Sequence, residues 1–263
     1  MSKQQDNKPP VIMCFSGHDP SGGAGLQADI EAIAANHAHA CTVTTALTVQ
    51  DSARVKRLVP VEVDLFQDTA NTILNDMPIS AFKTGLLADA KIAQAIIEIT
   101  NQHPDIPLVV DPVLASGAGN KLANAELIKI IQEQLLPLAT IATPNLPEAQ
   151  QLSGQQHADD CAEHLLATGC QYVLLTGTHA TTDNVINTLY SNETRVEFAV
   201  ERLNGDYHGS GCTLAASLAA NLANGHDIAT AVSMALNYTW QSLKHGHAIG
   251  KGQLHPNRQF LND

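Results

Sequence analysis

The chain has 263 residues, of which 26 are acidic and 14 basic, so its formal net charge is -12. This excess of negative charge opposes broad binding to nucleic acid or to an anionic membrane, and we expect neither as a partner. The first ten residues are polar and no apolar run approaches the ~18 residues of a membrane span, which favours a cytoplasmic protein with a disordered tail at 1–10.

The first predicted unit is a strand, a glycine-rich turn and a helix. Residues 11–15 are apolar, residues 16–25 contain four glycines, and apolar side chains then recur with helical spacing at Leu26, Ile30 and Ile33. The glycines do not form a G-x-G-x-x-G fingerprint, and no Gly-Lys-Ser/Thr follows them. Both a dinucleotide fingerprint and a P-loop are therefore excluded.

Strands and helices alternate along the rest of the chain. Composition and periodicity predict strands at 40–49, 55–63, 81–84, 108–110, 140–142 and 172–176, and helices at 64–75, 90–100, 123–135 and 159–167. Two runs at 184–190 and 195–200 predict a hairpin, and helices around the glycine loop at 209–211 and at 228–244 complete the chain. This alternation predicts a single domain with a three-layer α/β/α sandwich and a mainly parallel central sheet.

Polar residues follow the predicted parallel strands. In such sheets ligands bind beyond the carboxyl ends of the strands, so we expect these residues at one rim. Taken alone, Asp111-Pro112 and the segment 145–148 are typical of turns and helix caps. Their common location instead favours Mg-nucleotide chemistry, which needs a metal and donors for phosphoryl charge. The rim residues include Asp19, Gln50, Lys83, Asp111, Asn145, Glu148 and Thr176.

A glycine loop that runs into an alanine-rich helix carries the strongest chemical signal. Gly209, Ser210 and Gly211 let the backbone approach a ligand closely, and the unpaired N–H groups of a helix start attract anions. Cys212 lies in this first turn, where the helix dipole is expected to lower the pKa of its thiol. On its own the stretch also fits an ordinary loop before a core helix with an inert cysteine.

Five motifs together carry a family resemblance. They are SGHDPSGGAGLQAD at 16–29, KTGLLA at 83–88, VDPV at 110–113, TPNLPEA at 143–149 and HGSGCT at 208–213. From about Val11 to Lys251 the sequence resembles the hydroxymethylpyrimidine/phosphomethylpyrimidine kinases of the ribokinase-like superfamily. The resemblance implies two successive ATP-dependent phosphorylations in thiamin biosynthesis, of 4-amino-5-hydroxymethyl-2-methylpyrimidine and then of its monophosphate. It also implies ATP and Mg²⁺ as cofactors, and we expect a homodimer.

The resemblance assigns roles to individual residues. Gly209, Ser210, Gly211 and the amide of Cys212 match the anion hole for the transferred phosphoryl group, and Cys212 is the candidate base. Asn145 and Glu148 match the N-x-x-E motif that supports magnesium and the phosphates. The remaining positions match an acidic residue near the metal (Asp111), the nucleotide side (Thr176), a glutamine that hydrogen-bonds the pyrimidine (Gln50) and the substrate pocket (Gly17, Asp19, Ala24, Thr48, Leu86 and Val113).

Two departures from the family pattern concern lysines. Thr176 opens a Thr-Gly-Thr-His segment where many relatives have a lysine that reaches the nucleotide phosphates. The segment 114–119 also lacks a lysine found in many relatives, although Lys121 follows closely. Nucleotide affinity and the second phosphorylation are therefore the parts that the resemblance supports least.

Other functions stay open on sequence alone. A pyridoxal kinase would share the fold and the site, a sugar or nucleoside kinase is disfavoured by Cys212, and a non-catalytic pyrimidine-binding regulator is disfavoured by the intact motif residues. Five irregularly spaced cysteines without a C-x-x-C pair indicate reduced thiols. The pairs His37/His39 and His245/His247 have i,i+2 spacing, which favours surface side chains over a metal site.

Overall fold

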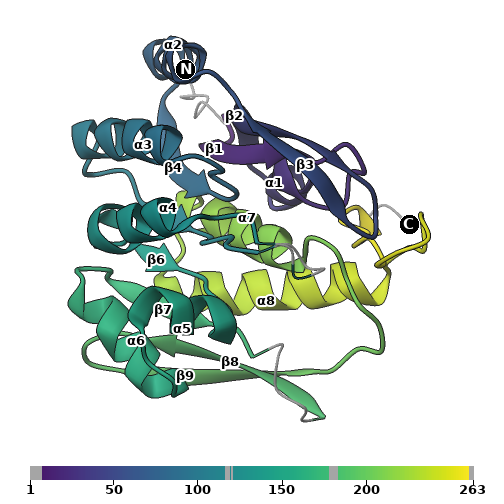
Figure 1. The fold of residues 1–263 in the computed structure, drawn as a ribbon. Helices are drawn as coiled ribbons and strands as arrows, with labels where there is room; N and C mark the ends of the chain where they lie inside the picture. Colours follow the sequence, from purple (N-terminus) through teal and green to yellow (C-terminus); the bar gives the residue numbers. More distant parts are fainter. Residues whose placement is uncertain (1–7, 116–118, 120, 178–182, 261–263) are drawn as a thin grey trace, which may run out of the picture.

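A computed structural model of the chain describes residues 8–115, 119, 121–177 and 183–260. Six parallel strands form the centre of its sheet: β1 (Val11–His18), β2 (His39–Gln50), β4 (Ile79–Thr84), β5 (Leu108–Val110), β6 (Ile141–Ala142) and β7 (Tyr172–Leu175). Three antiparallel strands complete it: β3 (Val55–Pro60) beside β2, and the hairpin β8 (Asn184–Tyr190) and β9 (Arg195–Glu201) beside β7. The strand order is β3-β2-β1-β4-β5-β6-β7-β8-β9 (Figure 1).

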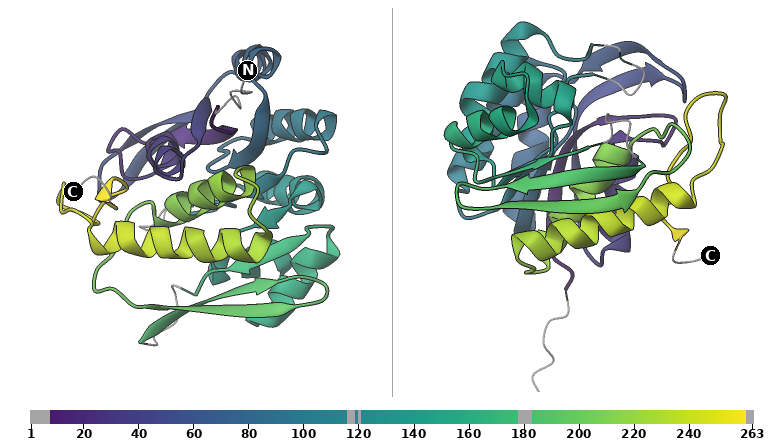
Figure 2. Two further views of the ribbon diagram at one scale, coloured as in Figure 1. Left: turned by 180° about the vertical axis from the view of Figure 1, so that it is seen from behind. Right: turned by 90° about the horizontal axis from the view of Figure 1, so that it is seen from below.

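Helices cover both faces of this sheet (Figure 2). One face carries α1 (Gly25–Ala35), α7 (Ser210–Ala223) and α8 (Ile228–Lys244), whose alanines pack on alternate strand residues such as Ile12, Val109 and Leu174. The other face carries α2 (Val63–Asp76), α3 (Ala90–Gln102), α4 (Ala125–Ile130), α5 (Leu146–Ser153) and α6 (Ala158–Ala167). The three-layer α/β/α fold with a mainly parallel sheet is therefore confirmed.

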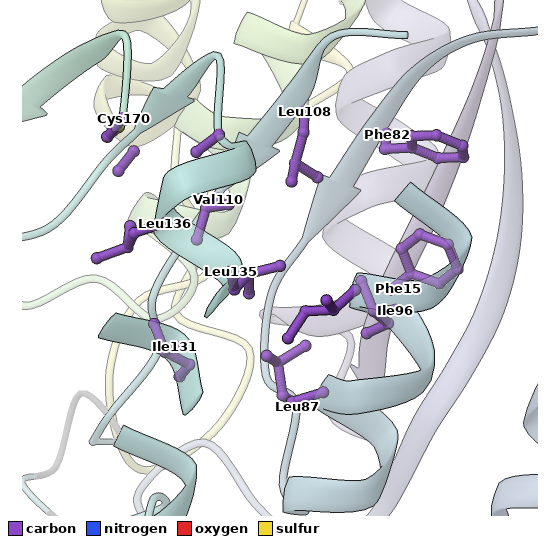
Figure 3. Close-up of a cluster of buried hydrophobic side chains, with 14 of the residues drawn as sticks. Phe15, Phe82, Leu87, Ile96, Leu108, Val110, Ile131, Leu135, Leu136 and Cys170 are labelled. Carbon is purple, nitrogen blue, oxygen red and sulfur yellow. The ribbon is translucent and has the colours of Figure 1, made fainter. Parts of the chain in front are cut away.

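The core beneath α2 and α3 is built around three phenylalanines. The ring of Phe15 on β1 lies 5.7 Å from that of Phe66 and 5.8 Å from that of Phe82. Figure 3 shows the adjoining part of this core, where Phe15 and Phe82 lie near Leu87, Ile96 and Leu108. A rigid apolar support of this kind holds the strand ends, and so the residues that follow them, in fixed positions.

Most predicted elements match the structure within a few residues, with three differences. The helix α5 was not predicted, because its eight residues carry a proline at the second position and few large apolar side chains, although Asn145 had been given as a possible helix cap. The helix expected at 123–135 is α4 followed by a π-helical turn, Ile131–Leu135, and a short 3-10 turn, Leu136–Leu138. The strand expected at 55–63 ends at Pro60, and residues 1–7 of the expected tail lie outside the described residues.

Two glycine segments come together at the carboxyl ends of the strands. Gly25 (φ +57°) begins α1 and Gly209 (φ +79°) caps α7, so both adopt the left-handed backbone that favours glycine. A Cβ at Gly209 would overlap the carbonyl oxygen of Gly23, and one at Gly25 would overlap that of Gly17. The loop after β1 and the start of α7 therefore touch backbone to backbone.

The chain after α8 returns to this same region. The Gly252 N–H donates to Ser52 Oγ at 3.0 Å, and the His208 N–H donates to the Leu254 carbonyl at 2.9 Å. These contacts place residues 252–254 beside the turn between β2 and β3 and beside the loop that enters α7.

Within the described ranges, no helix combines the length and the apolar content that a membrane crossing requires.

Candidate active site

A cavity of about 730 Å³ opens at the carboxyl ends of the parallel strands. Every residue to which the resemblance assigned a role lines it: Gly17, Asp19, Ala24, Thr48, Gln50, Leu86, Asp111, Val113, Asn145, Glu148, Thr176, Gly209, Ser210, Gly211 and Cys212. Lys83, which the sequence also placed at this rim, is completely buried and does not line the cavity. Four buried side-chain oxygens in its wall have no hydrogen-bond partner in the described structure. They are Ser16 Oγ, Asp111 Oδ2, Thr143 Oγ1 and Thr239 Oγ1. Because buried polar atoms normally have partners, these oxygens are available to a polar ligand.

The N-terminus of α7 forms one wall of the cavity. Gly209 is its N-cap, and neither an acidic nor a basic side chain stands in its first turn. The N–H groups at the start of a helix have no partner within that helix, so they and the helix dipole favour an anion. Thr213, fully buried in the same turn, donates its hydroxyl to the Gly209 carbonyl at 2.8 Å. This hydrogen bond stabilises the turn and leaves its backbone N–H groups available to an anion.

Two neighbouring acidic residues line the cavity, and one of them lies beside this helix start. A Cβ on Gly211 would stand 3.8 Å from Asp111 Oδ1, so Asp111 lies directly against α7. Burial raises the pKa of Asp111 to about 6, although Lys83 opposes the shift. Burial, together with the negative charge of Asp111, raises the pKa of Glu148 to about 8. Two adjacent acids that resist ionisation together are suited to share a cation, because a cation relieves their repulsion.

The segment Asn145–Glu148 serves as a helix cap and as part of the cavity wall at once. Asn145 Oδ1 accepts from the Glu148 N–H, and Glu148 Oε2 accepts from the Asn145 N–H, both at 3.0 Å. Glu148 Oε1 also accepts from the Leu114 N–H at 3.5 Å, which ties the segment after β5 to α5. The capping box therefore fixes a carboxylate that faces the cavity, and the cap and site interpretations do not compete.

Below the cavity lies a buried ion pair that the sequence did not reveal. Lys83 Nζ contacts Asp29 Oδ1 at 2.8 Å, and both side chains are completely buried. Burial alone would lower the pKa of Lys83, but its electrostatic interactions, above all with Asp29, raise it well above its ordinary value. A permanent positive charge therefore sits under Asp111 and Cys212. The signal was present in the two motifs that carry these residues, but their pairing spans 54 positions.

The pKa of Cys212 is raised, whereas the sequence predicted a lowered pKa at a helix start. Burial raises the pKa of this thiol to about 12, and the lowering effect of Lys83 does not compensate. The expectation of a lowered pKa was wrong, because removal of the thiolate from water outweighs the helix dipole here. The remaining four cysteines, Cys14, Cys41, Cys161 and Cys170, are buried free thiols.

Asp19 organises the end of the cavity that contains Gln50. Its Oδ1 accepts from the N–H of Ser21 at 2.8 Å, while Oδ2 accepts from the N–H of Ala24 at 2.8 Å and faces His208 Nε2 at 2.8 Å. Burial alone would raise the pKa of Asp19, but hydrogen bonds from His208, Gln50 and Ser21 hold it well below the ordinary value. Asp19 therefore holds Gln50 and the loop in position, and it lines the cavity at the same time.

The opposite end of the cavity contains Thr176 and an arginine. Thr176 lines the cavity and its hydroxyl donates to the Pro144 carbonyl at 3.5 Å. Arg202, directly after β9, is the only Lys or Arg among the described residues that line the cavity. Sequence reasoning missed it, since nothing in a hairpin pattern marks the residue that follows. The two segments that depart from the family pattern, 114–119 and 176–179, are only partly described: residues 116–118, 178 and 179 lie outside the described residues.

No cluster of three or more His, Cys, Asp or Glu side chains in the described ranges forms a metal cage. Mg²⁺ does not need one, because it binds through one or two carboxylates and completes its shell with phosphate and water oxygens. Asp111 and Glu148, with the unpartnered Asp111 Oδ2, fit such a shared ion.

Comparison with known proteins adds a family to this geometry. The sequence model of the family described as phosphomethylpyrimidine kinase matches residues 19–257. The hydroxymethylpyrimidine/phosphomethylpyrimidine kinase of Mycobacterium bovis is 36% identical over 252 residues, which cover 93% of this chain and 92% of that protein. An ADP complex of Bacillus subtilis pyridoxal kinase has a TM-score of 0.90 at 29% identity and covers 97% of this chain and 99% of its own. Phosphomethylpyrimidine kinase from Clostridium difficile 630 has a TM-score of 0.78 at 30% identity, and the match covers 89% of this chain and 98% of that one.

Proposed function

The chain belongs to the phosphomethylpyrimidine kinase family, and from this premise we propose that it phosphorylates 4-amino-5-hydroxymethyl-2-methylpyrimidine and then the resulting monophosphate, using ATP. One observation carries the proposal: the anion-binding start of α7, the acidic pair Asp111 and Glu148, and Gln50 line one cavity of about 730 Å³. Phosphoryl transfer requires these parts within reach of one another, because catalysis rests on positioning and on stabilising the transferred charge.

Each part of the cavity has a task in this reaction. Gln50 holds the aminopyrimidine edge, since an amide both donates and accepts. The amides of residues 209–212 receive the charge of the transferred phosphoryl group, and Cys212 takes or orients the proton of the substrate hydroxyl. Mg²⁺, held by Asp111 and Glu148 together with the phosphates, would neutralise charge on the nucleotide. Asn145 keeps Glu148 in place through the capping box.

Several further features belong to the proposal. A homodimer is supported by the exposed apolar side chains of Leu47, Val49 and Val59 on the β2–β3 edge, and light scattering on the purified protein tests it. We also propose a single functional domain, on the basis of the one nine-stranded sheet, and a cytoplasmic location.

Pyridoxal is the competing substrate, because the Bacillus subtilis pyridoxal kinase shares the fold over nearly its whole length. Incubation with Mg-ATP and either hydroxymethylpyrimidine or pyridoxal, with the products identified by mass spectrometry, separates the two activities. We expect mono- and diphosphate products from the pyrimidine and a slower reaction with pyridoxal. Turnover of pyridoxal at an equal or higher rate would reverse the assignment.

Gln50→Ala tests the pyrimidine end of the cavity. We expect weaker pyrimidine binding by about 0.5 to 1.5 kcal/mol, because one neutral contact with the ligand is lost, and a small fall in the melting temperature, because the hydrogen bond from Gln50 to Asp19 is lost as well. Calorimetric titration with hydroxymethylpyrimidine measures the change. Gln102→Ala, at the exposed end of α3, is the control. An unchanged affinity in Gln50→Ala would remove this residue from the substrate site.

Arg202→Met tests the nucleotide end. Arg202 is the only Lys or Arg among the described lining residues. Its loss should therefore weaken the binding of ATP and of ADP, each by about 1.5 to 3 kcal/mol, but leave the binding of adenosine nearly unchanged. Arg195→Met, at the first residue of β9, is the control because that side chain pairs with Asp159 and Glu197 on the surface. Equal weakening of adenosine and ATP would show that Arg202 does not bind phosphate.

Glu148→Gln tests the metal side and has two expected results. The folded protein holds the proton of Glu148 up to a pKa of about 8, compared with 4.5 for an ordinary glutamate, so the stability this proton provides is present below pH 4.5 and lost as the pH rises through about 8. The uncharged glutamine should therefore raise the melting temperature of the metal-free protein at pH 8 but not at pH 4.

The same change should lower the apparent affinity for Mg²⁺ on the order of 10-fold or more, because one negative ligand is gone. Turnover measured against Mg²⁺ concentration checks this, with Glu126→Gln in the first turn of α4 as the control. Wild-type turnover at limiting Mg²⁺ would leave Glu148 with only its capping role.

A further inference from the structure

A buried arginine near the C-terminus, Arg258, contacts both the loop after β1 and the first turn of α7. Residues after α8 fold back beside the loop that follows β1 (Figure 2), and the side chain of Arg258 is only 1% exposed. Its backbone carbonyl accepts from the Tyr238 hydroxyl at 2.7 Å, and the neighbouring Asn257 N–H donates to the Ser242 carbonyl at 2.9 Å. The segment is thus anchored on α8, and the guanidinium points inward.

The guanidinium bridges three separate elements. Its Nη1 donates to the Gly22 carbonyl at 3.3 Å and to Glu31 Oε2 on α1 at 3.1 Å, and its Nη2 donates to the Gly23 carbonyl. Its Nε donates to Thr213 Oγ1 in the first turn of α7 at 2.9 Å. All three nitrogens are therefore engaged, in the fork geometry that arginine provides and lysine does not.

These contacts converge on Gly209. The carbonyl of Gly23, held by Arg258, is packed against Gly209 so tightly that a Cβ there would overlap it. From the other side, Thr213 Oγ1 accepts from Arg258 and donates to the Gly209 carbonyl at 2.8 Å. Arg258 therefore reaches the N-cap of α7 by two routes, one through the glycine loop and one through the helix.

We propose that Arg258 is a positioning residue for phosphoryl transfer: it fixes the loop at 22–25 against the start of α7 and thereby sets the amides of residues 209–212 that receive the phosphoryl group. The inference rests on the proposed function of these amides. Displacement of such a group by about 1 Å costs on the order of 100-fold in rate. Of the residues assigned to the pyrimidine pocket, Ala24 lies in the loop at 22–25, whereas Gln50 and Thr48 lie on β2, so pyrimidine binding should depend less on Arg258 than the transfer step does.

The test uses Arg258→Lys and Arg258→Met in the full-length protein, at a temperature where circular dichroism shows each variant folded. We expect kcat for the first phosphorylation to fall at least about tenfold in Arg258→Lys and further in Arg258→Met, while the dissociation constant of hydroxymethylpyrimidine changes less than about threefold. Tyr238→Phe is the matched control, because it removes a bond to the same segment but none to the guanidinium. It should lower the melting temperature and leave kcat unchanged.

Thr213 provides a second pair of variants if Arg258→Met fails to fold. Thr213→Val keeps the shape but removes the hydroxyl between Arg258 and Gly209, whereas Thr213→Ser retains it. A fall in kcat in the valine variant, rescued in the serine variant, supports the proposal. Unchanged kcat in folded Arg258→Lys and Thr213→Val, with only the melting temperature lowered, would overturn it. Absence of pyrimidine phosphorylation by the wild type would instead contradict the proposed function itself.

Discussion

Replacing Lys83 with methionine is expected to lower the free energy of unfolding by about 3 to 5 kcal/mol. Asp29 contacts Lys83 at 2.8 Å and is itself completely buried, so the variant would leave an uncompensated charge in the core. Urea denaturation measures the loss. Lys56→Met is the control: its pairing with Asp51 at 3.4 Å is about half exposed, and the expected change is under about 1 kcal/mol.

A double variant separates stability from chemistry. Asp29→Leu combined with Lys83→Met removes both charges, and replacement of a buried ion pair by apolar groups is often neutral or stabilising. We expect the stability to return but the turnover to stay low. Lys83 lowers the pKa of both Asp111 and Cys212, and Asp29 raises them by less, so loss of the pair should leave the metal site and the thiol less readily ionised. Full turnover in the double variant would limit Lys83 to a structural role.

The parts of the site that sequence predicted are those in which one local rule decides the outcome. The glycine turn after β1, the cap at Asn145 and the glycine start of α7 each follow from backbone chemistry within a few residues. Parallel strand order then brings their ends together, which is why the predicted residues line one cavity. The resemblance to a family supplied roles that spacing alone could not.

The parts that sequence missed depend on contacts between distant residues. Arg258 reaches Gly23 across 235 positions, and no local pattern marks an arginine in a short C-terminal segment as buried. The pKa of Cys212 was mispredicted for a related reason: the helix dipole is visible in the sequence, but the depth at which the thiol lies is not. Burial is a property of the whole fold, so charge balance inside a site has to be read from the structure.

Cys212→Ser is expected to slow the first phosphorylation by about 10² to 10⁴-fold. Serine preserves the size of the side chain and the backbone amides at the start of α7, but it replaces the thiol with a hydroxyl of far higher pKa. The second phosphorylation should slow much less, because its nucleophile is a phosphate oxygen that is already ionised near neutral pH. Rates of both steps in the variant measure the difference, and equal losses would assign Cys212 to the anion hole or to packing instead of proton transfer.

The raised pKa of Cys212 gives this proposal a pH dependence of its own. With a pKa of about 12, only about one thiol in 10⁴ is ionised at pH 8, but the thiolate that forms is a strong base, as a hydroxyl proton requires. At saturating Mg²⁺ and ATP, the wild-type rate of the first step should therefore rise about tenfold per pH unit from pH 7 to 9 without a plateau. The second step should vary little over this range, because its nucleophile is already ionised at pH 7. A first step that is equally flat would mean that the hydroxyl proton leaves without help from Cys212.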